Sequence, residues 1–70
     1  MFAMVKYNKR LEKWVVVMES KAYAEYEAKT KVDAVFYAKE CLEGVNEVLV
    51  EKKNGTMDRV YKKNQYGVWK

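Results

Sequence analysis

The side chains that most enzymes use for proton transfer or nucleophilic attack are scarce in this sequence. There is no histidine, so the commonest base at neutral pH and a principal metal ligand is missing. Cys41 is the only cysteine and has no imidazole to activate its thiol. The three glycines, Gly44, Gly55 and Gly67, are isolated, so no glycine-rich phosphate loop is present. We therefore predict a protein that is not an enzyme and that uses no metal and no cofactor.

Positive charge interleaved with an aromatic ring marks the segment after residue 51. The formal net charge is +4, and the basic excess lies in residues 1–13 and 52–70. Lysine and arginine neutralise phosphates, and an exposed ring stacks on a base. The first binding hypothesis is therefore a nucleic-acid contact made by Lys52, Lys53, Arg59, Tyr61, Lys62 and Lys63. The alternative, which stays open, is a solvated edge strand that its lysines protect from aggregation.

Aromatic residues outside the basic segment support a second hypothesis, a protein-protein contact such as that of a phage-type inhibitor or adaptor. Its anchors are Phe36, Tyr66 and Trp69, or the second face of the sheet, because large aromatic side chains are typical of interface centres. The alternative is that Tyr66 and Trp69 only close the core of the domain itself.

A helix over residues 31–43 is the clearest expected element. Thr30 is placed to cap its first turn, Asp33 completes a capping box, and Gly44 ends it. A helical wheel separates an apolar side from a charged side, on which Phe36 also falls. The apolar side, which we expect to face the core, comprises Ala34, Val35, Ala38, Cys41 and Leu42.

Residues rich in β-branched and alternating side chains predict strands over 3–8, 14–18, 22–28, 47–51 and 57–63. Asn54 and Gly55 suit a two-residue type I′ turn between the last two strands. That turn would put Val48 and Val50 on one face of the sheet. We expect that face to include Met57, Arg59 and Tyr61 as well, with Arg59 at the rim of the core.

The order β-β-β-α-β-β predicts a single α+β domain over residues 1–70, in which one helix packs on one face of a small antiparallel sheet. Trp14, Val16 and Met18 alternate with Val15 and Val17, so the second strand is apolar on both sides. The second face therefore needs a cover. We expect either the C-terminal residues 66–69 or a second copy of the chain, which would make a homodimer.

The beginning of the chain and the lone cysteine bear on location. A charge at Lys6 interrupts the first apolar run too early for a signal peptide, and no apolar run is long enough to cross a membrane. A short chain without disulfides is typical of a reducing compartment. We expect a cytoplasmic protein without membrane contact.

Short motifs spread from Trp14 onward resemble the small bacterial and phage proteins grouped as domain of unknown function 2188. The matching segments are Trp14-Val15-Val16, the helix start Thr30-Lys31-Val32-Asp33-Ala34 with Ala38, Val48-Leu49-Val50, Asn54-Gly55 and Tyr66-Gly67. The sequence departs from that pattern in carrying Asp33 where glutamate is usual and in its aromatic tail. The resemblance implies a bacterial or phage origin and the same small α/β fold, and it implies no catalytic residue.

Overall fold

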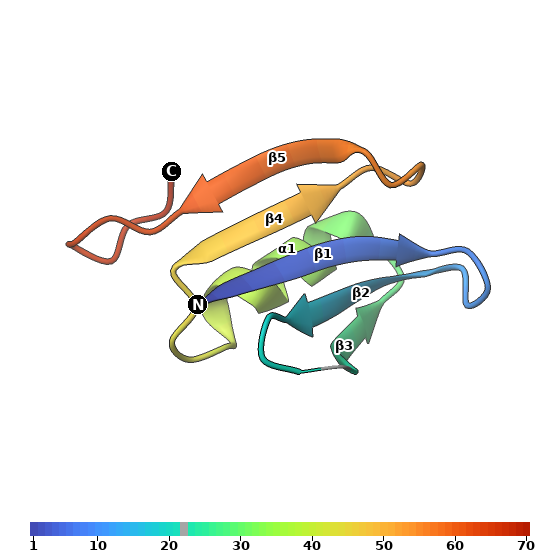
Figure 1. Cartoon of the computed structure of the whole chain (residues 1–70), viewed down its shortest axis with the longest axis horizontal. Helices are drawn as coiled ribbons and strands as arrows, with labels where there is room; N and C mark the ends of the chain where they lie inside the picture. Colours follow the sequence, from blue (N-terminus) through green and yellow to red (C-terminus); the bar gives the residue numbers. More distant parts are fainter. Residues whose placement is uncertain (22) are drawn as a thin grey trace.

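The computed structural model describes residues 1–21 and 23–70. Within them, five strands and one helix follow in the order expected (Figure 1). They are β1 (Phe2–Asn8), β2 (Lys13–Met18), β3 (Ala24–Ala28), α1 (Lys31–Glu40), β4 (Glu47–Glu51) and β5 (Met57–Lys62). The predicted α+β class is confirmed. Position 22, where the third strand was expected to begin, lies outside the described residues.

The strands form one mixed sheet in the order β3-β2-β1-β4-β5. Neighbouring strands are antiparallel except for the central pair β1 and β4, which is parallel. The parallel pair arises because α1 carries the chain from β3 across the sheet, past β2, to the far side of β1 (Figure 1). A crossover of this kind is the usual route between strands that run in the same direction. We had expected a purely antiparallel sheet, and the parallel pairing of β1 with β4 corrects that prediction.

The core lies between α1 and one face of the sheet, which we call the helix side. Val5, Val16, Val48 and Val50 from three adjacent strands are almost fully buried there. Ala34 and Ala38 have no exposed surface, and such small side chains let the helix approach the sheet closely.

Both ends of α1 have local causes. The backbone N–H of Asp33 donates to Oγ1 of Thr30 at 3.2 Å, so the predicted N-cap is confirmed. At the other end α1 stops at Glu40, and Cys41 is the C-cap. Cys41 is exposed rather than part of the core, because the helix ends before the expected apolar side reaches it.

The turn between β4 and β5 is one residue longer than predicted. Gly55 takes a φ of +89°, its N–H donates to the carbonyl of Lys52 at 2.9 Å, and the N–H of Lys52 donates to the carbonyl of Thr56 at 2.8 Å. These bonds define a three-residue loop with a left-handed glycine. The register also shifts next to Val50, so Met57 pairs with Glu51 and leaves the face shared by Arg59 and Tyr61.

The C-terminal residues fold back beside the end of β5 and not over the second face of the sheet. Lys63 and Trp69 form an isolated antiparallel bridge, and the N–H of Lys70 donates to the carbonyl of Lys62 at 3.0 Å. The Trp69 side chain packs against the helix-side core. The second face, which we call the open face, is therefore left uncovered by this segment.

Within the described residues, no helix has the length and apolar character needed to cross a membrane.

Candidate functional site

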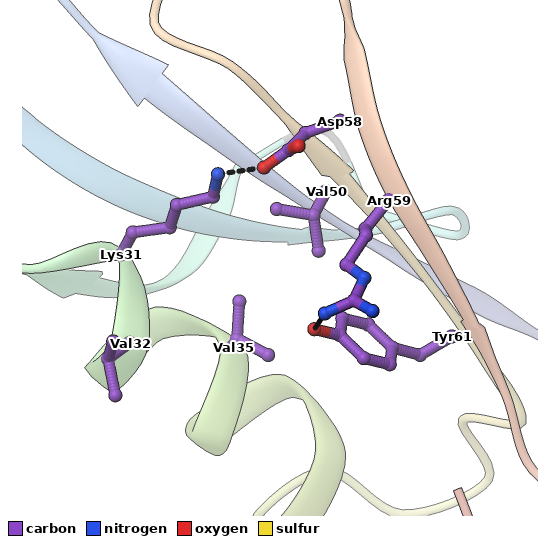
Figure 2. Close-up of a pocket in the computed structure, with 7 residues that line it drawn as sticks. All are labelled: Lys31, Val32, Val35, Val50, Asp58, Arg59 and Tyr61. Carbon is purple, nitrogen blue, oxygen red and sulfur yellow. Dashed lines mark hydrogen bonds and ion pairs between the residues drawn. The ribbon is translucent and has the colours of Figure 1, made fainter. Parts of the chain in front are cut away.

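A groove lies between α1 and β5, because the backbone of α1 packs over β1 to β4 and stays apart from the backbone of the edge strand. Long side chains of α1, such as those of Lys31 and Lys39, reach across to β5. The groove encloses about 320 Å³. Figure 2 shows its lining, with three residues from the first half of α1 on one side and three from β5 on the other. The lining residues are Lys31, Val32, Val35, Val50, Asp58, Arg59 and Tyr61.

The floor and one wall of the groove are apolar. Val50 of β4 forms the floor and is 1% exposed. Val35 is half-buried against the core, whereas Val32, one turn earlier on α1, is 76% exposed. A ligand in the groove would therefore cover apolar surface that the fold itself leaves in water.

Two side chains from β5 form the opposite wall. Arg59 and Tyr61 pair with Val50 and Val48, and the alternation of a strand directs both side chains to the helix side. The Nη1 of Arg59 donates to the hydroxyl of Tyr61 at 3.2 Å. The guanidinium carbon of Arg59 lies 5.3 Å from the centroid of the Tyr61 ring, and Nζ of Lys39 lies 3.5 Å from it. Tyr61 thus holds two cations next to the groove.

Asp58 is the acidic residue of the groove, and basic residues surround it. Its carboxylate accepts a hydrogen bond from Nζ of Lys31, the first residue of α1 (Figure 2). This hydrogen bond lowers the pKa of Asp58, and the charges of Lys31, Lys52 and Arg59 lower it further. Asp58 is therefore ionised at neutral pH, and it fixes Lys31 at the mouth of the groove.

Cations and aromatic rings continue beyond the groove. Nζ of Lys31 lies 5.5 Å from the centroid of the Trp14 ring. The Tyr7 ring meets Trp14 edge to face at 5.2 Å and carries Nζ of Lys53 at 4.9 Å. All of these rings pack on the helix-side core, so the cations gather on that side of the molecule.

The structure divides the six residues expected to contact nucleic acid. Arg59 and Tyr61 line the groove, and Lys52 is close enough to Asp58 to lower its pKa. Lys53 lies over Tyr7, just outside the groove. Lys62 points to the open face instead, where its Nζ lies 4.0 Å from Glu47, and Lys63 lies over Trp69 at 5.5 Å. The basic strand is thus not one continuous patch, because alternate residues of β5 face opposite sides of the sheet.

Sequence reasoning missed Lys31 and Lys39, which α1 contributes to this site. They were not singled out because lysines on a helix are usually only solvated. The spacing i, i+4, i+8 of Lys31, Val35 and Lys39 places all three on one side of α1 and was the available signal. That this side borders β5 depends on the strand order, which the spacing does not give.

The three aromatic anchors expected for a protein contact do not come together. Phe36 is 61% exposed on α1, and Tyr66 is 80% exposed in the turn after β5. Trp69 is half-buried and packs against the helix-side core, which is the alternative role considered for it. Within residues 1–21 and 23–70, no ring-to-ring contact joins any two of the three.

Comparisons with protein-family models, with curated proteins and with solved structures give no match to this chain. The resemblance to domain of unknown function 2188, and the bacterial or phage origin that it implies, therefore stay predictions. In the part of the chain that the structure describes, no three side chains of the acidic, cysteine or histidine type group together as a metal site would need.

Proposed function

We propose that this protein binds single-stranded nucleic acid in the groove between α1 and β5, without catalysing a reaction. The observation that carries the proposal is the combination of an apolar groove with cations on both of its walls. Lys31 comes from α1, Arg59 from β5, and Tyr61 lies between Arg59 and Lys39. Nucleotides offer the matching chemistry, namely an anionic backbone and flat apolar bases.

The charge balance of the groove favours an anionic ligand. Four cations, Lys31, Lys39, Lys52 and Arg59, lie at or beside it, and Asp58 is the acid among them. Salt bridges at an exposed site are weak, so the pair between Lys31 and Asp58 offers little resistance to a phosphate that competes for Lys31. The excess positive charge draws a polyanion towards the groove and makes its binding depend on salt.

The shape of the site favours a single strand over a duplex. Proteins read duplex DNA with an element that projects into a groove of the DNA. This site is instead a hollow of about 320 Å³ with exposed Val32 on its wall and Tyr61 at its side. Such a hollow suits an unpaired base that packs against the apolar wall while its phosphates contact the cations.

A salt titration with a matched pair of variants tests the proposal. Arg59 and Lys62 lie on the same strand and face opposite sides of the sheet. We expect the affinity for a fluorescent single-stranded oligonucleotide to fall with salt, with a log-log slope of about −3 for four phosphate contacts. Arg59→Gln should bring that slope to about −2, because one contact is lost. The control Lys62→Gln should leave it unchanged.

The variant Asp58→Asn should change the affinity in the opposite direction. It removes the acid that pairs with Lys31, so the affinity for the oligonucleotide should rise. The proposal fails if the protein does not bind single strands at low salt, or if Arg59→Gln and Lys62→Gln weaken binding equally. The latter result would mean that general positive charge, and not the groove, attracts the strand.

A further inference from the structure

The open face of the sheet carries an apolar row that crosses the four strands β2, β1, β4 and β5. The register joins Val17, Met4, Leu49 and Val60 as direct neighbours, one from each of these strands. Their neighbours in sequence on β1, β2 and β4 are core residues of the helix side, so these side chains point the other way. Val60 is 44% exposed. An apolar sheet face is normally buried against another layer of structure.

The row next to this apolar row carries opposite charges on adjacent strands. Val15 pairs with Lys6, and Glu51 pairs with Met57. Lys6 and Glu51 each follow the central pair Val5 and Val50 by one residue, so they are neighbours on β1 and β4. Neither takes part in an ion pair within the described residues.

We propose that a second copy of this chain covers the open face, related to the first by a twofold axis that runs along the strands between β1 and β4. This axis places β4 of the second copy over β1, and β5 of the second copy over β2. Lys6 then meets Glu51 of the second copy, and the symmetry makes the same contact twice. No other class of partner is needed to neutralise the charges on this face.

The same axis matches the apolar residues. Met4 meets Leu49 of the second copy, and Val15 meets Met57, which is 49% exposed in one chain. A hollow of about 230 Å³ on β1 and β2, lined in part by Phe2, Met4 and Val17, lies opposite Val60 of the second copy. Two sheets packed with strands nearly aligned bury their facing side chains in this way.

The size of the face sets the expected strength of the dimer. The axis overlaps four strands of each copy, and four strands spaced by about 4.8 Å with five residues of about 3.4 Å each give a face of roughly 330 Å² in projection. This is well below the roughly 800 Å² per partner of a standard specific interface and falls in the range of weak, transient complexes. We therefore expect a reversible dimer whose population rises between micromolar and millimolar protein concentration. The groove beside α1 stays accessible in both copies, because it lies on the opposite side of the sheet.

Two charge reversals and their mixture test this arrangement. Lys6→Glu puts two acidic pairs into its own homodimer, and Glu51→Lys puts two basic pairs into its own. Each should weaken the homodimer about tenfold or more in sedimentation equilibrium. In an equimolar mixture, both contacts between the two variants have opposite charges. The mixed dimer, counted by native mass spectrometry, should therefore exceed both homodimers.

The mixture distinguishes a contact between two chains from an effect within one chain. Each variant carries the same altered neighbours on its own β1 and β4 in the mixture as alone, so only a contact between chains can change when the two variants are mixed. Glu40→Lys, the same change as Glu51→Lys but on α1, should leave the dissociation constant unchanged. A wild-type chain that stays monomeric up to millimolar concentration overturns the proposal. So does a mixture that associates no better than the separate variants. Neither result bears on the groove, whose binding to an oligonucleotide is measured separately.

Discussion

At the scale of single residues, Asp58 determines how the cations of the groove are held. Its carboxylate accepts from Lys31, and the charges of Lys31, Lys52 and Arg59 add to the effect, so the pKa of Asp58 lies below its usual value of 3.8. A carboxylate with a lowered pKa in the folded state stabilises that state above its unfolded pKa. The stabilisation is lost as the pH falls through the lowered pKa.

The lowered pKa of Asp58 predicts how the stability of one variant depends on pH. Asp58→Asn should unfold at a lower temperature than the wild type at neutral pH, because it loses the ion pair with Lys31. The difference should begin to shrink below the unfolded pKa of 3.8 and disappear once the pH has fallen through the lowered pKa of folded Asp58, where the wild-type carboxylate is protonated. Thermal unfolding followed by circular dichroism at several pH values measures it. A difference that is the same at every pH would show that charge is not its cause.

At the scale of elements, the edge strand β5 has few stabilising contacts. It pairs with β4 on one side only, and α1 reaches it through long side chains such as Lys31 and Lys39 while its backbone stays apart. Trp69 adds a second attachment, because it packs on the helix-side core while its backbone bridges to Lys63 at the end of β5. The tail thus gives the end of β5 a second attachment to the core.

Two truncations of aromatic side chains test this role of the tail. Trp69→Ala should lower the free energy of unfolding by about 2 kcal/mol, since it removes a half-buried side chain from the core. Tyr66→Ala should change it by less than about 0.5 kcal/mol, because that side chain is 80% exposed. Urea unfolding measures both values. Equal losses would contradict the assignment of Trp69 to the core and Tyr66 to the surface.

Local patterns predicted the elements well because their causes are local. The β-branched run at Trp14 to Met18 forms β2, and Thr30 caps α1 as its hydroxyl suggested. The parallel pairing of β1 with β4 and the longer turn at Gly55 were not predicted. The first depends on where the crossover places β4. The second depends on a choice between glycine turns that the dipeptide alone does not settle.

Only part of the candidate site could be predicted from the sequence, because the rest depends on contacts between segments that are distant in the sequence. Arg59 and Tyr61 were identified from their charge and aromatic character on a predicted strand. Their partner Lys39 is distant in the sequence and comes beside Tyr61 only through the packing of α1 next to the sheet edge. Lys62 had the same composition signal as Arg59, yet strand alternation places it on the open face.

The whole molecule presents two different surfaces. On the helix side, a basic groove lies along an uncovered edge strand. On the open face, an apolar row with balanced charges crosses the sheet. Cations beside an apolar hollow suit a polyanion, whereas an apolar face with complementary charges suits a second copy. The two proposals therefore assign different partners to opposite sides of one sheet, and each can fail without the other.

The most direct test of the groove is to map the contact of an added single-stranded oligonucleotide by backbone amide chemical shifts. The account predicts that the largest changes fall on the first turns of α1 and on β5, including Lys31, Val35 and Arg59. Amides of Met4 and Val17, whose side chains point to the open face, should move little. Changes centred on the open face, or spread evenly over all lysines, would contradict a binding site between α1 and β5.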